Sequence, residues 1–185
     1  MCIRDRFDEV QTGFARTGEW FAWQHHFDSE GTVRPDVVTM AKALGNGFPI
    51  GAIWAKREVA AAFQPGDHAT TYGGQPLATS AARAVLRVME SIDAPSLARS
   101  AGEELMGKLL AVPNVLDTRG LGLLIAAEID TETVGMTGPE IALACLEVGL
   151  VVNGISPTAI RLAPPLTVSS EEIDEAMTKL SSVLG

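Results

Sequence analysis

The chain is short of cysteine, aromatic residues and positive charge, and each shortage excludes a class of protein. Its 185 residues include only two cysteines and one tyrosine. Cys2 and Cys145 are too few for the disulfide framework that holds small secreted domains together. Lysine and arginine number 14 against 23 aspartates and glutamates, a net charge of −9. This balance argues against nucleic-acid binding, because phosphate neutralisation needs clustered cations.

Long apolar runs are also missing. The stretch 120–129 is too short to span a membrane, and residues 1–6 lack the apolar segment of a secretory signal. The hydrophobic fraction of 46% and the charged fraction of 20% are typical of a globular protein with a buried core. We therefore expect a cytoplasmic protein whose partners are small molecules or another protein chain, with no nucleic acid and no membrane.

One lysine stands out in the stretch 35–49. A short apolar run after Pro35 predicts a buried strand, and the Gly-Asn-Gly-Phe-Pro sequence that follows predicts a tight turn. Lys42 lies at their junction and is the only charged residue between Asp36 and Lys56. A lysine held in apolar surroundings loses hydration of its ammonium, which lowers its pKa and frees a nucleophilic amine. Such an amine suits Schiff-base chemistry, although a structural lysine at a strand end is the alternative.

A carboxylate pair upstream complements this lysine. Asp8 and Glu9 follow an apolar residue and precede the turn at Gly13. Pyridoxal phosphate chemistry needs a lysine for the covalent bond and an acid that keeps the pyridine nitrogen protonated. Asp8 and Lys42 are candidates for these two groups. Glu9 either supports a neighbouring residue or is simply solvated.

Periodicity predicts helices alternating with short strands, with a domain boundary near Asp93. In the helix over 76–92 we expect the inward residues to be Leu77, Ala81, Val85, Val88 and Met89. Leu97 is expected to face inward from the next helix. A capping box of Ser169 with Glu172 begins the closing helix. We expect strands over 36–40, 51–55, 115–118, 123–129, 150–153 and 159–162, and helices over 19–27, 57–63, 76–92, 95–111, 139–148 and from 169 onward.

The adjacent histidines His25 and His26 do not indicate a metal site. On a helix they point about 100° apart, and no acidic or thiol companion stands at ligand spacing. The Gly45-Asn46-Gly47 turn has the wrong glycine spacing for a dinucleotide-binding loop, and Pro49 interrupts the helix that such a loop needs. We therefore expect neither a metal nor a dinucleotide.

Three stretches in series resemble the class III (ornithine-type) pyridoxal-phosphate-dependent aminotransferases. They read DEVQTGFARTG over 8–18, PDVVTMAKALG over 35–45 and HATTYGGQPLA over 68–78. The resemblance runs from about Phe7 to the C-terminus. It implies the type I fold, an α/β large domain with a mostly parallel sheet followed by an α+β small domain. We expect residues 7–92 to be the C-terminal part of the large domain and 93–185 the small domain.

This resemblance also implies an entire N-terminal half before Phe7. The charged residues Arg4, Asp5 and Arg6 stand where a buried parallel strand should have an apolar run. We therefore expect a C-terminal fragment that begins inside a strand, with residues 1–6 foreign to the fold or disordered.

The resemblance implies roles for four residues around pyridoxal 5'-phosphate. Lys42 would bond covalently to the cofactor and, once released, carry the proton between substrate and cofactor. Asp8 would pair with the pyridinium nitrogen. Val10 would pack against one face of the ring, and Gln11 would reach its phenolic oxygen.

Two further residues are implied in the loop before the helix over 76–92 and in the stretch IRLAPP over 160–165. Thr71 would bind the cofactor phosphate of the neighbouring subunit, which implies a homodimer with shared active sites. A plain helix cap is the alternative for this loop. Arg161 would grip the substrate α-carboxylate, whereas an edge-strand arginine paired with a structural carboxylate is its alternative. Arg16 and His68 are interpreted as structural. Asn153 is expected within reach of the substrate or of Arg161, and no role is assigned to it.

The expected reaction is transamination of N-acetylornithine with 2-oxoglutarate, within arginine biosynthesis. Other members of the family acting on ornithine, 4-aminobutyrate or a succinylated diamine remain alternatives. A different kind of alternative is that the 185-residue chain on its own is an inactive truncated fragment. In that case the implied N-terminal half would carry the glycine-rich phosphate loop and the aromatic residue stacked on the ring.

Overall fold

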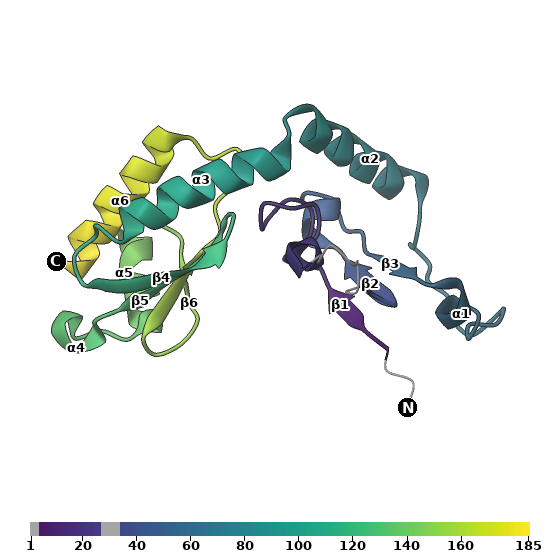
Figure 1. Cartoon of the computed structure of the whole chain (residues 1–185), viewed down its shortest axis with the longest axis horizontal. Helices are drawn as coiled ribbons and strands as arrows, with labels where there is room; N and C mark the ends of the chain where they lie inside the picture. The colour runs from purple at the N-terminus through teal and green to yellow at the C-terminus, as the bar shows by residue number, and fades with distance from the viewer. Residues whose placement is uncertain (1–3, 27–33) are drawn as a thin grey trace. The chain divides into compact units, whose positions relative to one another are not determined.

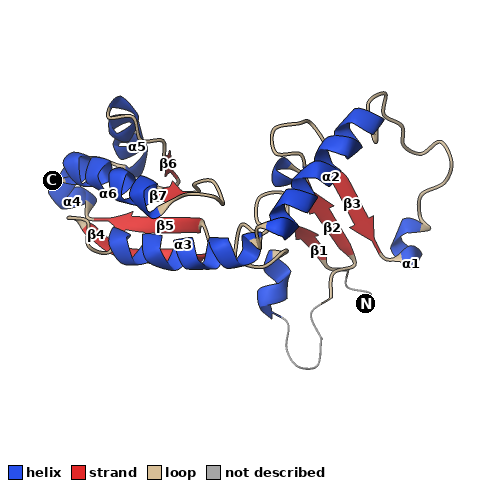
Figure 2. Cartoon of the chain, turned by 90° about the horizontal axis from the view of Figure 1, so that it is seen from above, coloured by secondary structure: helices blue, strands red, loops and turns tan. Residues whose placement is uncertain are grey.

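The computed structural model describes residues 4–26 and 34–185 and divides into two compact units. The first unit takes the chain up to Ala15 together with Glu19–Asp93, and the second takes Arg16–Gly18 together with Ala94–Gly185. Both contain strands and helices (Figures 1 and 2), which confirms the expected α/β class. No helix within the described ranges is long and apolar enough to cross a membrane.

A three-stranded sheet and mostly short helices make up the first unit. Its elements are β1 (Arg6–Asp8), η1 (Ala22–His26), β2 (Val37–Met40), η2 (Lys42–Leu44), β3 (Ala52–Ala55), α1 (Arg57–Ala60) and α2 (Pro76–Ser91). The strand order is β1-β2-β3, with β1 parallel and β3 antiparallel to β2. In Figure 2 helix α2 lies over these strands, and it contacts η2.

Helix α2 begins at Pro76, as expected, and Met89 is buried as predicted, with Ala81 and Val85 half-buried, but the rest of the predicted inward face differs. Leu77 and Val88 are 66% and 57% exposed, so their expected inward orientation is wrong. The buried residues are Ala78, Ala82 and Met89. Alanine lets a helix approach its neighbour closely, and the sequence pattern gave too much weight to the larger apolar side chains.

Other parts of the chain also differ from expectation, among them the expected helix over 57–63, which is the four-residue α1 (Arg57–Ala60). The helix over 19–27 is a 3₁₀ turn confined to Ala22–His26, and Phe27 lies outside the described residues. The strand over 150–153 is replaced by the two-residue strand β6 (Asn153–Gly154), since only these two residues pair with β7. Leu97, expected inward, is 40% exposed.

The N-terminal residues join the first sheet where the structure describes them. Arg6 is the first residue of β1 and lies opposite Val37. The carbonyl of Asp5 accepts hydrogen bonds from the backbone of Asp36 at 2.8 Å and of Val37 at 3.1 Å. Strand pairing therefore continues through two of the charged residues that the sequence pattern placed outside the fold. Residues 1–3 lie outside the described part of the chain.

The second unit has a four-stranded antiparallel sheet in the order β4-β5-β7-β6. Its elements are α3 (Ala94–Leu109), β4 (Val115–Leu121), β5 (Leu124–Ile129), α4 (Thr131–Val134), α5 (Gly138–Glu147), β6 (Asn153–Gly154), β7 (Ala159–Leu162) and α6 (Ser170–Leu184). The side chains of β5 alternate between half-buried and buried, as a sheet with one covered face requires.

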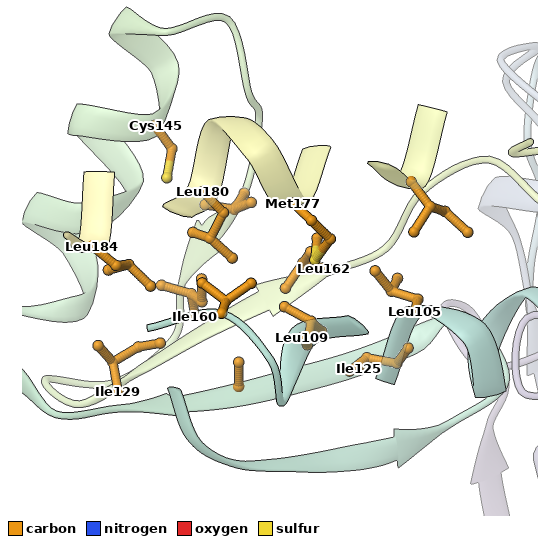
Figure 3. Packing of buried hydrophobic residues seen from close by; sticks show 14 of the residues in the cluster. Leu105, Leu109, Ile125, Ile129, Cys145, Ile160, Leu162, Met177, Leu180 and Leu184 are labelled. Carbon is orange, nitrogen blue, oxygen red and sulfur yellow. The ribbon is translucent and has the colours of Figure 1, made fainter. Parts of the chain in front are cut away.

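The hydrophobic core of this unit lies between that sheet and three helices (Figure 3). Ile125 and Ile129 from β5 and Ile160 from β7 project from the covered face of the sheet. The core residues that the helices α3, α5 and α6 contribute are Ala98, Leu105, Leu109, Ile141, Cys145, Ile173, Met177, Leu180 and Leu184. Truncating one such side chain to alanine costs about 2–5 kcal/mol in typical cores. The second unit therefore has a dense core of its own.

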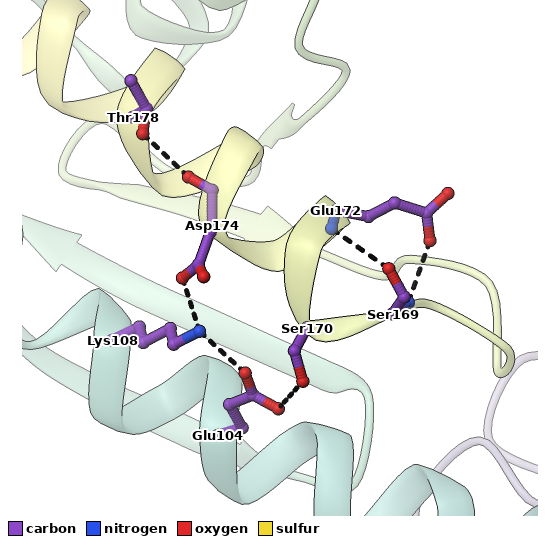
Figure 4. A network of polar contacts seen from close by, with 7 residues as sticks. All are labelled: Glu104, Lys108, Ser169, Ser170, Glu172, Asp174 and Thr178. Carbon is purple, nitrogen blue, oxygen red and sulfur yellow. Dashed lines mark hydrogen bonds and ion pairs between the residues drawn. The ribbon is translucent and has the colours of Figure 1, made fainter.

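Polar contacts fix α6 against α3 at the edge of that core (Figure 4). The Lys108 ammonium donates to Asp174 at 2.5 Å and to Glu104 at 2.7 Å, and the Ser170 hydroxyl donates to Glu104 at 2.9 Å. The hydrogen bonds from Lys108 and Ser170 lower the pKa of Glu104, and those to Asp174 and Glu104 raise the pKa of Lys108. The capping box of Ser169 and Glu172 is confirmed.

Two glycines bring α3 and the turn between β4 and β5 into backbone contact. A Cβ on Gly102 would collide with the main chain of Gly122. Gly122 itself has a φ of +52°, and a Cβ there would lie 2.6 Å from the carbonyl carbon of Thr17. The Leu123 N–H donates to the Arg16 carbonyl at 2.9 Å. The segment Arg16–Gly18 is therefore anchored to the second unit by its main chain.

Candidate functional site

Strand pairing brings Asp8 and Lys42 to the same edge of the first sheet. Asp8 is the last residue of β1 and lies opposite Thr39, close to the end of β2 at Met40. Lys42 follows two residues beyond that end. Because β1 and β2 are parallel, their carboxyl ends share one edge, with strands about 4.8 Å apart. Open α/β sheets bind ligands at this kind of edge.

The Asp8 carboxylate is exposed and oriented by the turn that follows it. Its Oδ1 accepts the backbone N–H of Val10 at 3.1 Å, which is the arrangement of an Asx turn. The Thr12 hydroxyl donates to the Asp8 carbonyl at 3.3 Å. Val10 and Gln11, both half-buried, lie within this turn. The acid expected for the pyridine nitrogen is thus accessible to a ligand and held by its own backbone.

Glu9 is buried, with 2% of its surface exposed, so the solvated alternative is wrong. Its carboxylate accepts the Thr12 hydroxyl at 2.5 Å and the backbone N–H of Trp23 at 3.0 Å. Its own N–H donates to the carbonyl of Thr39 on β2 at 2.9 Å. Glu9 therefore fastens the turn that carries Val10 to both η1 and β2.

Lys42 occupies a backbone conformation that is rare for its residue type. Its φ of +45° lies in the left-handed region, which costs a residue other than glycine roughly 1–3 kcal/mol and is concentrated at functional sites. The Lys42 carbonyl accepts the N–H groups of Gly45 and Asn46, each at 3.1 Å. A Cβ on Gly45 would collide with the carbonyl of Phe48, so only glycine fits.

The side chain of Lys42 is exposed, so the expected apolar surroundings are wrong for the part of the chain that the structure describes. Short apolar neighbours in sequence pointed to a buried amine, but Lys42 stands beyond the last strand residue, where the backbone turns outward. The tight turn was expected and is present. The amine is presented at the sheet edge by a rigid turn.

Thr71 lies outside the sheet, in the loop between α1 and α2, and is exposed. It precedes the first residue of α2, Pro76, by five positions. Gln75 occupies the cap position of α2 and makes no side-chain capping hydrogen bond, so the plain-cap alternative for this loop lacks support there.

Arg161 belongs to the second unit and lies on β7, opposite Asn153 on β6 and Ala126 on β5. Because β7 has a neighbour on each side, the edge-strand alternative is wrong. The Arg161 Nη2 donates to the Asn153 side-chain carbonyl at 3.2 Å. Asn153 was expected within reach of the substrate or of Arg161 without an assigned role, and the contact with Arg161 is present.

A second arginine, Arg16, is structural as interpreted. Its Nη1 donates to the backbone carbonyls of Leu123 at 3.1 Å and Pro164 at 2.5 Å. Burial lowers the pKa of this guanidinium. Within residues 4–26 and 34–185 no group of three or more His, Cys, Asp or Glu side chains is arranged to hold a metal.

Comparison with known proteins places these features in a family. The family described as aminotransferase class-III matches residues 6–184. The acetylornithine aminotransferase of Caldanaerobacter subterraneus is 45% identical over 183 residues, and that of Bacillus subtilis is 41% identical over 182. Each alignment covers 96% of this chain and 44% of the relative. The chain thus spans less than half the length of these curated relatives.

Solved structures of aminotransferases also match this chain. The ornithine aminotransferase of Toxoplasma gondii, with partial occupancy of PLP at its active site, matches with a TM-score of 0.82 at 30% identity, covering 97% of this chain and 42% of that one. The acetylornithine aminotransferase of Elizabethkingia anophelis matches with a TM-score of 0.78 at 32% identity, covering 95% and 46%.

Proposed function

The chain belongs to the class-III aminotransferases, and from this membership we propose that its complete protein transfers the amino group of N-acetylornithine to 2-oxoglutarate. The curated relatives named above support the amine donor. The observation that carries the proposal is the shared sheet edge, where Asp8 ends β1 and Lys42 follows the end of the parallel strand β2. The 2-oxo acid and a place in arginine biosynthesis, in the cytoplasm, belong to the same proposal.

The cofactor of this family is pyridoxal 5'-phosphate, and the residues present suit it. Asp8 and Lys42 are both exposed at the edge, as a carboxylate for a ring nitrogen and an amine for an aldehyde must be. When bound, the cofactor supplies an electron sink for the carbon that loses a proton. Asp8 holds a proton at the ring nitrogen, and Lys42 Nζ moves a proton at the substrate carbon that bears the amine.

The remaining assignments complete the proposal. Val10 packs against the ring, and Gln11 binds its phenolic oxygen. Arg161 binds the substrate α-carboxylate through its planar fork. Thr71 binds the phosphate of a partner subunit's cofactor, which makes the protein a homodimer with shared sites. Residues 7–92 form part of the large domain and 93–185 the small domain.

Substitution of Lys42 in the complete protein tests the catalytic assignment. We expect Lys42→Ala to lower turnover by at least about 10²–10⁴-fold, because a positioned proton-transfer group is lost. Borohydride reduction followed by peptide mass spectrometry should locate the cofactor on Lys42 in the unaltered protein. Lys179→Ala, at a half-buried lysine paired with Glu175, is the matched control. Cofactor fixed to another lysine, or full turnover in Lys42→Ala, would contradict the assignment.

Two alternatives are separated by simple assays. The ornithine aminotransferases among the matched structures favour ornithine as a second candidate donor, and a panel of acylated and free diamines ranks the two by kcat/KM. The inactive-fragment alternative is tested by assaying the 185-residue chain beside the complete protein. We expect weak cofactor binding and little turnover from the chain alone.

A further inference from the structure

Asn153 holds the arginine that we assign to the substrate carboxylate. In the register of β6 and β7 it stands opposite Arg161, and its Oδ1 accepts the Arg161 Nη2 at 3.2 Å. The neighbours of Arg161 along β7, Ile160 and Leu162, are buried in the core, so the pair lies on the other face of the sheet. We propose that Asn153 is a positioning residue that orients Arg161 for carboxylate binding, an inference that rests on the proposed function.

The backbone beneath Asn153 is held in place, as a positioning role requires. A Cβ on the next residue, Gly154, would lie 2.5 Å from the Pro139 Cα and 2.6 Å from the Gly138 carbonyl carbon. The backbone of the two-residue strand β6 therefore packs closely against the first residues of α5. The Gly138 N–H donates to the Pro157 carbonyl at 2.7 Å, which fixes α5 to the loop between β6 and β7.

The chemistry of an amide suits this position better than that of a carboxylate. Asn153 accepts a hydrogen bond without bringing a charge, so it restrains the guanidinium without competing electrostatically for it. An aspartate in its place would form a charge-assisted pair with Arg161. That pair would oppose the entry of a substrate carboxylate. The asparagine therefore combines orientation with an undiminished attraction for the anion.

Steady-state kinetics of the complete protein test this role with two substrates. N-acetylornithine carries the carboxylate, and N-acetylputrescine is the same molecule without it. For Asn153→Ala we expect KM for N-acetylornithine to rise about fivefold to tenfold, with kcat little changed, as loss of one hydrogen bond predicts. Asn153→Asp should raise this KM further. Neither variant should alter KM for N-acetylputrescine.

Binding without turnover gives the same comparison. N-acetylnorvaline keeps the carboxylate but lacks the reacting amine, and calorimetry should show its Kd rising in the order unaltered protein, Asn153→Ala, Asn153→Asp. Asn114→Ala is the matched control, because Asn114 donates to the Leu184 carbonyl at 2.8 Å within the second unit. It should lower the unfolding temperature and leave KM and Kd unchanged.

The outcomes separate this inference from the proposed function. If Arg161→Ala leaves KM for N-acetylornithine unchanged, the carboxylate assignment fails and the positioning role fails with it. If Arg161→Ala raises KM but both Asn153 variants do not, only the positioning role is overturned. A KM penalty that is equal with N-acetylputrescine also overturns it. Should Asn153→Ala not fold, the isosteric Asn153→Asp carries the same test.

Discussion

Substitution of Arg16 by methionine should destabilise the second unit far from any reacting group. The Arg16 guanidinium donates to the carbonyl of Leu123, just before β5, and to that of Pro164, just after β7. Methionine keeps an apolar stem of similar length and removes both hydrogen bonds. Arg16→Met therefore isolates the contribution of the two polar contacts from that of packing.

The magnitude follows from the two contacts and their surroundings. A hydrogen bond from a charged donor contributes about 1.5–3 kcal/mol. The loss is offset because burial disfavours the charged guanidinium, as its lowered pKa shows, and because water reaches the part-buried carbonyls in the variant. We expect a net loss of about 2 kcal/mol. In a unit of roughly 100 residues this corresponds to a fall of about 10 °C in Tm.

Two optical signals weight the two units differently. The three tryptophans, Trp20, Trp23 and Trp54, belong to the first unit, whereas α3, α5 and α6 dominate the helix signal of the second. Thermal unfolding of the 185-residue chain by circular dichroism should therefore report the lower stability of the second unit, while tryptophan fluorescence follows the first. Arg87→Met, at an exposed residue of α2, is the matched control and should change stability by less than about 0.5 kcal/mol. Equal midpoints for the two variants would refute the reasoning.

Two further predictions concern Glu9 and the contacts of Lys108. Glu9→Ala should destabilise the first unit by about 3 kcal/mol, because the Thr12 hydroxyl and the Trp23 N–H lose their acceptor. Glu9→Gln should destabilise it by about 1 kcal/mol. Thermal unfolding followed by tryptophan fluorescence measures both, and an unchanged midpoint in Glu9→Ala would contradict the buried role. Glu104, whose folded pKa is lowered, should contribute stability above about pH 4.3 that is lost as the pH falls through the folded value. Lys108, whose folded pKa is raised, should contribute stability below about pH 10.4 that is lost as the pH rises through the folded value. Circular dichroism across this range should show a smaller acid-induced fall in Glu104→Gln than in the unaltered chain, and an equal fall in both would contradict the assignment.

Local sequence signals predicted the regular elements well. The strands β2, β3 and β7 and the helices α2, α3, α5 and α6 lie within a few residues of their expected bounds, because periodicity, Pro76 and the Ser169 cap are local features. The inward orientation of Leu77 and Val88 on α2 was wrong, whereas that of Met89 was right, because the buried face depends on what the helix packs against. The length of β6 was wrong for a similar reason, since its pairing with β7 is tertiary.

For the candidate site too, features set by local sequence were predicted, and features set by tertiary contacts were not. The positions of Asp8 at the end of β1 and of Lys42 just beyond the parallel strand β2 follow from short motifs. The left-handed backbone of Lys42 and the burial of Glu9 had no local signal, because each depends on main-chain and side-chain contacts formed only in the fold. The hydrogen bonds of Arg16 join residues 107 and 148 positions apart, a separation at which sequence patterns carry no pairing information.

At the contact between Gly102 and Gly122, helix and sheet meet main chain to main chain. Exposed side chains of α3 can vary during evolution without disturbing that contact, whereas any substitution at either glycine opens it. In a directed-evolution library these two positions should be the first to lose tolerance as selection for folded protein tightens.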